Sequence, residues 1–400
     1  MREVPPSAGL PLACRDLAAP SLRSLEQGLA DFLGVRRLRL ECSGSAALVV
    51  ALSTLRRQSA RRRVVVPAYT CPLVAFAILH CGLVPVPCDL LPGSIQFDPA
   101  RLAEQCDDDT LAIIPTHLGG RVAELSQADS AARGCGAALI EDAAQSLGAR
   151  IDGRPVGLAG DAGFFSLAVG KGLTTYEGGV LVAREERLRE AFDLTSADIA
   201  RPSRWMELRR CLELTGYAAF YRPAALGFAY GTLLRHRLRR GRLIAAAGED
   251  FSGEIPLHPM GRWRKAVGAA ALGRLPAFLA SLESLARKRL EPLSAVRGVS
   301  VLADGPHGGG TWPFYMVLLL TERARDAALA RLWGAGLGVS RLYIHALQDY
   351  PYLAAKLEPR AAPRARDLAA RMLTVSNSPW LDDAGFSRIT GVLTDAARSA

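Results

Sequence analysis

The feature that most constrains the fold of this 400-residue chain is an alternation of short β-rich runs with helical stretches between residues 40 and 185. The β-rich runs are 64–66, 84–86, 112–114, 138–140, 164–165 and 180–182. This alternation predicts an α/β fold whose large domain has a mostly parallel central sheet covered by helices on both faces. Ligands of such sheets bind at the carboxyl ends of the strands, so polar residues that follow the runs are candidate site residues.

The second half of the chain breaks this rhythm. An arginine-rich helical segment covers about 195–258, and the segments after it are a helix over 264–290 interrupted at Pro276, a strand over 314–320, a helix over 322–333 and a tail from Pro363. We predict two domains. Residues 1–255 form an N-terminal segment and the large domain, including the insertion, and residues 256–400 form a smaller α+β C-terminal domain.

The insertion carries much of the net charge of +10, because ten arginines between Arg201 and Arg242 are balanced only by Glu207 and Glu213. Its segment 212–234 is nearly uncharged but is not a clean apolar stretch of about 20 residues, as a spanning helix requires. We therefore expect 212–242 to form a helical hairpin packed on the protein or a peripheral membrane contact. No nucleic-acid-reading motif accompanies the arginines, so nucleic acid is not an expected partner.

The cysteines and the N-terminus bear on metal binding and location. The eight cysteines are scattered without zinc-ligand spacing, so we expect buried free thiols and neither a metal centre nor a disulfide framework. Residues 1–12 lack the basic start, apolar run and cleavage site of a secretory signal, so the expected location is the cytoplasm.

The first chemical motif is the run 138–140, which ends in Glu141 and Asp142 and is followed by Gln145. A carboxylate at the end of a strand could pair with a protonated pyridine nitrogen, which would let pyridoxal phosphate (PLP) act as an electron sink. Acids at strand ends are also common as helix N-caps, so this motif alone leaves both interpretations open.

The second motif is GDAGFFSLAVGKGLTTYEGG over residues 160–179. Its Ser166 could bind a phosphate oxygen, while Lys171 lies on a glycine-flanked loop and could form a Schiff base with PLP. That reaction needs a neutral amine, which burial favours by lowering the pKa of lysine. Lys171 is also the only lysine in the first 264 residues. The alternative is an ordinary solvated charge.

The third motif, SGSAAL over residues 43–48, opens an apolar helix. The start of a helix offers unpaired N–H groups and the positive end of the dipole to a phosphate. Ser45 could instead be an ordinary N-cap.

Together the three motifs closely resemble those of the DegT/DnrJ/EryC1/StrS family of PLP-dependent sugar aminotransferases. Members of that family show an S-G-T-A-A-L helix start, an E-D-A-A-Q strand end and an F-S-x-x-x-x-K-x-L-T-T-x-E-G-G loop, in this order, and here Ser45 replaces the threonine. Arg264 with 270–273 resembles the family's N-Y-R helix, and 338–352 resembles its C-terminal segment. The resemblance implies a PLP-dependent transferase of fold type I, which is aspartate aminotransferase-like.

The resemblance also implies roles for individual residues. Lys171 would be the Schiff-base lysine and catalytic acid/base, Asp142 would pair with the pyridine nitrogen, and Gln145 would lie against the ring or its hydroxyl. The phosphate would be held by Gly44, Ser45, Ala46 and Ser166, and the substrate would be bound by Glu177, Tyr343 and His345. Lysine rather than histidine at position 171 separates the chain from the family's sugar dehydratases.

Two residues depart from the family pattern. Cys71 stands where the family usually places an aromatic residue that stacks on the cofactor ring, and Tyr69 is a candidate to supply that stacking instead. Arg262 stands where the family has an asparagine that reaches the cofactor phosphate in the neighbouring subunit. The shared active sites of the family imply a homodimer.

The leading hypothesis is transfer of an amino group from glutamate to a keto sugar nucleotide in glycan or secondary-metabolite biosynthesis. Segment 212–242 motivates a second hypothesis, a transaminase for a membrane-presented or lipid-linked ketone. Cys71 and Arg262 motivate a third, a catalytically silent PLP-fold protein with an assembly or regulatory role. No G-x-G-x-x-G follows the first strand, which disfavours a nicotinamide-dependent enzyme.

Overall fold

The computed structural model describes residues 2–18, 23–305 and 307–398. Within them, the larger sheet has seven strands in the order β1-β9-β8-β5-β4-β2-β3. These strands are β1 (Arg39–Glu41), β2 (Arg63–Pro67), β3 (Val84–Cys88), β4 (Thr110–Ile113), β5 (Ala138–Asp142), β8 (Ala162–Ser166) and β9 (Gly179–Ala183). The pairs among β2, β3, β4, β5 and β8 are parallel, whereas β9 pairs antiparallel with both β8 and β1. The prediction of a mostly parallel sheet is confirmed.

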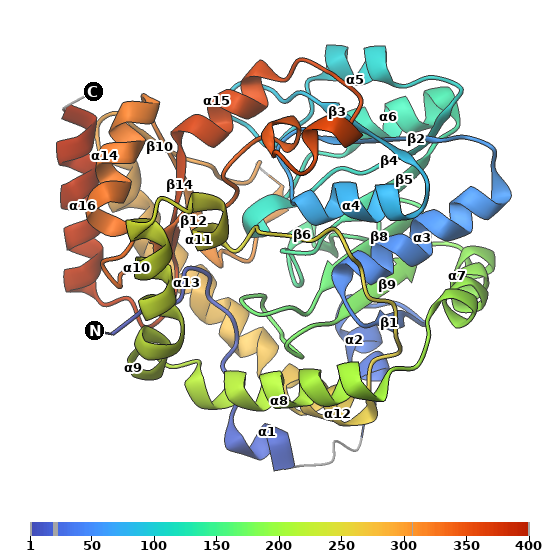
Figure 1. The fold of residues 1–400 in the computed structure, drawn as a ribbon, viewed down its shortest axis with the longest axis horizontal. Helices are drawn as coiled ribbons and strands as arrows, with labels where there is room; N and C mark the ends of the chain where they lie inside the picture. The colour runs from blue at the N-terminus through green and yellow to red at the C-terminus, as the bar shows by residue number, and fades with distance from the viewer. Residues whose placement is uncertain (1, 19–22, 306, 399–400) are drawn as a thin grey trace.

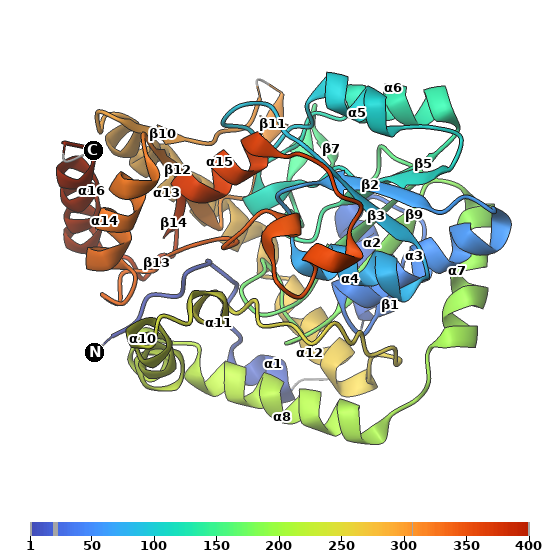
Figure 2. The same cartoon turned by 45° about the horizontal axis from the view of Figure 1, so that its top comes forward.

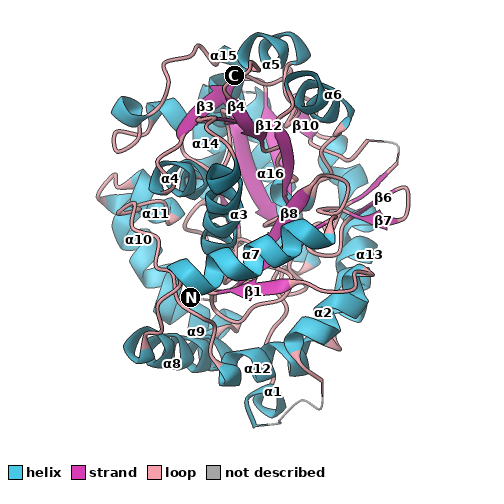
Figure 3. Cartoon of the chain, turned by 90° about the vertical axis from the view of Figure 1, so that its right-hand side faces the viewer, coloured by secondary structure: helices cyan, strands magenta, loops and turns pink. Residues whose placement is uncertain are grey.

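Helices cover both faces of this sheet, and the side chains of β2 show how. Val64 and Val66 point to one face, into a core formed with α3 (Gly44–Gln58), α4 (Pro72–His80) and α7 (Glu186–Ile199). Val65 points to the other face, into a core formed with α5 (Pro99–Gln105) and α6 (Ser126–Cys135). A strand buried on both faces is apolar throughout, which is why the sequence showed continuous runs rather than alternation. Figure 3 shows α3, α4 and α7 in front of the strands.

A second sheet lies beside the first, at the left of Figures 1 and 2. It is antiparallel, in the order β10-β12-β14-β13. Its strands are β10 (Val299–Val301), β12 (Phe314–Leu319), β13 (Val339–Ser340) and β14 (Met372–Ser376). It is accompanied by α14 (Glu322–Leu332), α15 (Pro363–Arg371) and α16 (Asp383–Arg398). The predicted strand and helix of the α+β region are therefore present as β12 and α14, and the tail from Pro363 forms α15, β14 and α16. The domain bounds at 255 and 256 stay a prediction.

The predicted helix over 264–290 is two helices, α12 (Arg262–Leu272) and α13 (Leu275–Ser294). The break falls at Gly273 and Arg274, and Pro276 lies in the first turn of α13, where the missing N–H costs no hydrogen bond. Shorter elements complete the fold. These are α1 (Cys14–Ala18), α2 (Leu25–Leu33) and a small sheet in which β6 (Arg150–Ile151) pairs with β7 (Arg154–Pro155) and β11 (Gly308–Gly309).

The arginine-rich insertion forms α8 (Arg204–Phe220), α9 (Pro223–Leu226), α10 (Thr232–Arg239) and α11 (Leu243–Ala247). The predicted helical hairpin is wrong, because α8 and α10 pack on different parts of the molecule. Tyr217 of α8 is buried with α12 and α2, whereas Leu234 of α10 is buried in the core of the second sheet. In Figure 1, α8 runs along the lower edge and α10 rises at its left end.

Two expectations about composition can be compared with the structure. All eight cysteines are free, but only Cys42 and Cys88 are buried, whereas Cys14 is exposed and the other five are partly exposed. Among the described residues no single helix is long and apolar enough to cross a membrane. Only α12 and α13 taken together meet that length and composition, and they are bent by 54°.

Candidate active site

A cavity of about 420 Å³ lies at the carboxyl ends of β5 and β8, beside the start of α3. It brings together nine of the predicted site residues: Gly44, Ser45, Cys71, Asp142, Gln145, Ser166, Lys171, Glu177 and Tyr343. It is also lined by residues that were not predicted, among them Thr116, Leu118, Phe164, Ala247, Gly248 and Phe251. Ala46, His345 and Arg262 do not line it.

Lys171 lies on the loop after β8, where Gly170 takes a positive φ of 80°. Gly170 O accepts a hydrogen bond from Ser7 Oγ (2.6 Å), which ties the loop to the N-terminal segment. Burial lowers the pKa of Lys171, and the nearby Cys71 and Asp142 only partly oppose that effect. The amine is therefore more readily neutral than an exposed lysine, as carbonyl chemistry requires.

Asp142 ends β5, and its backbone is held by the N–H···O bond to Pro115 O (2.9 Å). One carboxylate oxygen accepts from Ala144 N–H (3.0 Å). Burial raises the pKa of Asp142 to about 6, against the opposing effects of that N–H and of Lys171. The carboxylate thus lies in an environment where a cationic partner would favour its charged form.

Behind Asp142, the carboxylate of Glu141 is fully buried and was not predicted as a site residue. It accepts N–H bonds from Gly157 (2.7 Å), Ala159 (2.6 Å) and Gly160 (2.8 Å) and from the ring of His117 (2.9 Å). Burial alone would raise the pKa of Glu141, but these donors, with His117 foremost, lower it. The ionised carboxylate of Glu141 therefore holds the end of β5 in place and, with it, Asp142.

The start of α3 lies close against the end of β8. Ser43 is the N-cap, and its Oγ accepts from Ala46 N–H (3.0 Å), so the suggestion that Ser45 caps the helix is wrong. Ala46 is buried with its N–H in the cap, which removes it from the cavity surface. A Cβ on Gly44 would lie 3.1 Å from Ser166 Cβ, so the glycine permits the close approach. The first-turn N–H groups and the Ser166 hydroxyl therefore meet on one side of the cavity.

Gln145 and Tyr343 form another polar part of the cavity wall. Gln145 accepts from Gly119 N–H (2.7 Å) and donates to Tyr343 Oη (3.3 Å). Tyr69 does not line the cavity: its ring packs edge-on against Tyr343 at 5.5 Å, and its hydroxyl bonds the backbone of Tyr343. The prediction that Tyr69 supplies ring stacking is therefore wrong.

Two predicted residues lie away from the cavity. The ring of His345 contacts Tyr350 edge-on at 5.3 Å. Arg262 is exposed at the first residue of α12, and its role toward a neighbouring subunit stays a prediction.

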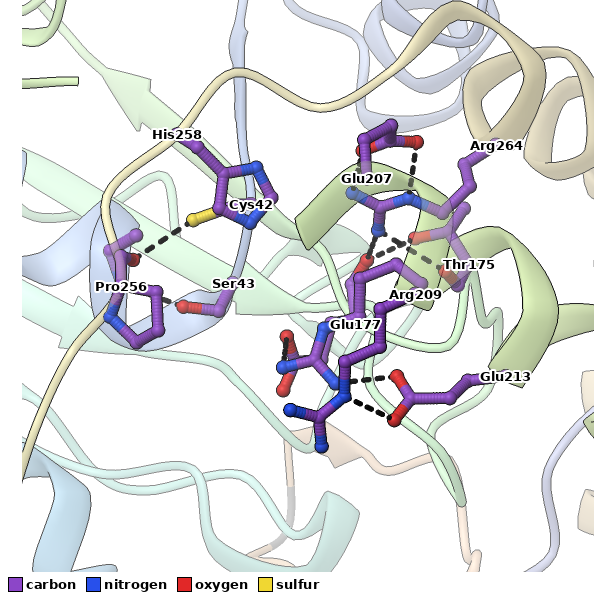
Figure 4. A network of polar contacts seen from close by, with 12 residues as sticks. Cys42, Ser43, Thr175, Glu177, Glu207, Arg209, Glu213, Pro256, His258 and Arg264 are labelled. Carbon is purple, nitrogen blue, oxygen red and sulfur yellow. Dashed lines mark hydrogen bonds and ion pairs between the residues drawn. The ribbon is translucent and has the colours of Figure 1, made fainter. Parts of the chain in front are cut away.

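The loop that carries Glu177 is held by residues of α12 and α8 (Figure 4). Arg264 is fully buried and donates to Glu207 through two bonds of 2.7 and 2.8 Å and to the carbonyl oxygen of Glu177 (2.5 Å). Arg210 pairs with the Glu177 carboxylate (2.7 Å) and with Glu213 (2.6 Å). In the sequence, Arg210, Glu207 and Glu213 count only as charges of the insertion and Arg264 only as part of a family-like helix, so these contacts with the Glu177 loop were not predicted.

The end of the insertion closes another side of the cavity through Ala247, Gly248 and Phe251. Glu249 anchors this segment. It is buried and accepts from Tyr350 Oη (2.8 Å) and Ile344 N–H (3.0 Å), and burial raises its pKa to about 7. Further along, Pro256 O accepts from Cys42 Sγ (3.1 Å) beside the α3 cap (Figure 4).

The mostly parallel sheet, the partly buried Lys171 and the buried Asp142 at its carboxyl edge and the helix start beside Ser166 define the PLP-dependent transferase fold of type I. The solved structure of DesI in the presence of its TDP-sugar product has this fold, with a TM-score of 0.76, 22% identity and coverage of 100% of this chain and 94% of that chain. The model of the DegT/DnrJ/EryC1/StrS aminotransferase family matches residues 17–217, and the protein belongs to this family.

Two curated relatives illustrate the likeness. A putative L-glutamine:3-amino-2,3-dideoxy-scyllo-inosose aminotransferase of Streptomyces kanamyceticus is 33% identical over 58% of this chain and 49% of the relative. GDP-perosamine synthase of Caulobacter vibrioides is 31% identical over 45% of this chain and 48% of the relative. The chain spans about half the length of these curated relatives.

Proposed function

We propose that the protein is a PLP-dependent aminotransferase that moves an amino group from an amino acid to the keto carbon of a sugar. One observation carries this proposal: the only lysine of the first 264 residues lies partly buried beside Asp142, in the cavity where α3 begins. A catalytically silent protein would have no need to keep a desolvated amine and a desolvated carboxylate together, because each costs stability.

The residues present fit PLP. The α3 start and Ser166 would hold its phosphate, Asp142 its pyridine nitrogen and Lys171 its aldehyde, while Gln145 would lie beside the ring. When bound, this cofactor supplies an electron sink for charge developing at the substrate carbon. Cys71 lines the cavity and leaves less ring stacking than an aromatic residue would.

The chemistry left to the chain itself is proton transfer and positioning. The Nζ of Lys171, whose pKa is lowered by burial, takes a proton from the α carbon of the donor and delivers one to the former keto carbon of the acceptor. Glu141 fixes Asp142 from behind, and Arg210 fixes the carboxylate of Glu177 toward the substrate side.

The donor we propose is glutamate, with glutamine as the rival because it appears in the name of the inosose aminotransferase. The acceptor we propose is a nucleotide-linked keto sugar, supported by the names of GDP-perosamine synthase and of the DesI complex with its TDP-sugar. We also propose a homodimer in which Arg262, exposed at the start of α12, contacts the neighbouring active site. A cytoplasmic location stays a prediction.

The decisive experiment combines spectroscopy with trapping. Purified protein incubated with PLP should develop a visible absorbance band that glutamate bleaches, and borohydride should attach the cofactor to Lys171 in peptide mass spectra. Lys171→Ala should lose both signals, whereas Lys288→Ala on the outer face of α13 should keep them. Protein that stays colourless and unmodified would refute the proposal and favour the silent interpretation.

Substrate identity needs a separate comparison. Glutamate and glutamine are each paired with a nucleotide-linked keto sugar and with an unlinked keto cyclitol, and the aminated product is detected by mass spectrometry. We expect product with the nucleotide-linked sugar. Product from the cyclitol alone would keep the aminotransferase proposal and refute the nucleotide-linked acceptor.

A further inference from the structure

A second cavity, of about 760 Å³, lies far from Lys171, between the insertion and the second sheet. Its walls come from α10 and α11 on one side and from α14 and the loop after it on the other. The apolar part is formed by Leu238, Leu243, Leu329 and Trp333. This volume is in the range of small-molecule sites.

The polar part of this groove is almost entirely cationic. Arginines 235, 239, 331, 341 and 388 line it, against a single acid, Asp326. Arg235 is paired with Glu3 (2.8 Å) and Arg331 with Asp395 (2.9 Å). Among the described residues, Arg239, Arg341 and Arg388 have no carboxylate partner within ion-pair distance. The groove therefore keeps an uncompensated positive charge next to apolar walls.

The segment that forms one wall is also unusual in sequence and exposure. Residues 222–248 contain six arginines and no acid. The same segment exposes large apolar side chains: Leu243, which lines the groove, is 41% exposed, and Phe228 and Leu233, which lie outside its lining, are 80% and 46% exposed. Exposed aromatic and aliphatic side chains beside uncompensated arginines are typical of a surface that contacts lipid, since the arginines attract phosphate and the apolar groups enter the acyl boundary.

We propose that this groove binds the phosphate headgroup of an anionic phospholipid, so that the insertion seats the protein on an anionic membrane surface. The same guanidinium groups would also attract a soluble diphosphate, but such a ligand would leave Phe228 and Leu233 unexplained. A lipid uses both the cationic and the apolar features. This inference goes beyond the proposed aminotransferase and does not depend on it.

Vesicle cosedimentation of the full chain tests the assignment. Wild-type protein should bind vesicles of mixed phosphatidylcholine and phosphatidylglycerol and should not bind phosphatidylcholine alone. Each arginine near such a surface contributes about fivefold to binding, so Arg239→Gln with Arg388→Gln should weaken binding about 30-fold. Raising the salt to about 1 M, where the Debye length falls to about 3 Å, should have the same effect on wild-type protein.

Two further variants keep the test specific. Arg101→Gln with Arg133→Gln removes two exposed, paired arginines from α5 and α6 on the far side of the molecule and should leave binding unchanged. Phe228→Ser keeps the charge but removes the most exposed apolar side chain, and it should weaken binding about tenfold.

Four results would overturn the proposal. The first is equal binding by wild type and the groove variant, and the second is equal binding to neutral vesicles. The third is calorimetric binding of inorganic pyrophosphate without vesicle binding, which would assign the groove to a soluble anion. The fourth is a wild-type protein that does not bind vesicles, together with a molar mass by light scattering that differs between wild type and the groove variant. That result would assign the groove to a second copy of the chain.

Discussion

Replacing Glu141 by glutamine tests how the end of β5 is held. In the native site each carboxylate oxygen accepts two N–H donors. Oε1 accepts from Ala159 (2.6 Å) and Gly160 (2.8 Å), and Oε2 accepts from Gly157 (2.7 Å) and the His117 ring (2.9 Å). An amide offers only one oxygen, so in either orientation its NH₂ group faces two donors that have lost their acceptor.

The geometry of His117 blocks the obvious rescue. Its Nδ1 accepts from Ala123 N–H (3.0 Å), so Nε2 must carry the proton that Glu141 accepts. The ring therefore cannot change tautomer to accept from the new amide. A hydrogen bond to a charged group contributes about 1.5–3 kcal/mol, and losing two such bonds should lower the free energy of unfolding by about 3–6 kcal/mol. That is a large fraction of the roughly 5–15 kcal/mol typical of a folded protein.

Urea unfolding at a fixed protein concentration would measure this loss. Asp161→Asn in the adjacent loop is the matched control. Its carboxylate is 43% exposed and accepts from Leu139 N–H (2.8 Å), a bond that asparagine can keep, so we expect a change below about 1 kcal/mol. Because the folded pKa of Glu141 is lowered, its contribution should be present at neutral pH and should fade as the pH drops below its ordinary value of 4.5. If Glu141→Gln unfolded like the control, the buried anion would not be what holds β5.

Other buried charges lead to three more expectations. Arg264→Met should lower the free energy of unfolding in urea by about 3 kcal/mol, because Glu207 and two carbonyl oxygens lose their buried donor. An unchanged free energy of unfolding would mean that α8 is held by other contacts. Arg210→Gln should raise KM about tenfold with little change in kcat, because Glu177 loses its partner; a loss confined to kcat would contradict this positioning role. Glu249→Gln should stabilise the protein at pH 8 by up to about 3 kcal/mol, because the folded protein must then ionise a carboxyl whose pKa is about 7. The gain should disappear below pH 4.5, where the carboxyl is protonated in both the folded and the unfolded protein. Thermal melting at both pH values would measure the difference.

Much of the site could be predicted because its parts are contiguous in sequence. Lys171, Ser166 and Glu177 lie within one loop region, and Asp142 with Gln145 follows one strand. Parallel strands bring their carboxyl ends to one edge, so finding the strands was enough to place these residues together. The scarcity of lysine then left Lys171 as the single candidate for an amine in the large sheet.

The remaining parts depend on register and on long-range contacts. Whether Ser43 or Ser45 caps α3 depends on a shift of two residues, which sequence rules do not resolve. Tyr69 lies outside the cavity because its ring packs on that of Tyr343, a contact across 274 residues that the sequence does not indicate. In the sequence, His117 and Glu141 could each be an ordinary polar residue after a strand. Only their contact in the structure shows that they form a pair.

The insertion shows why net charge alone is a poor guide to function. Its ten arginines look like one basic patch in the sequence, yet the structure divides them by what surrounds them. Arg210 is compensated by Glu213 and by Glu177, which lines the cavity. Arg239 lines the groove without a carboxylate partner among the described residues, and such a charge is available to an external anion. The acids next to each arginine, rather than the count of arginines, therefore separate an arginine that positions another side chain from one that can bind an external anion. The predictions for Arg210 and for Arg239 test these two cases independently.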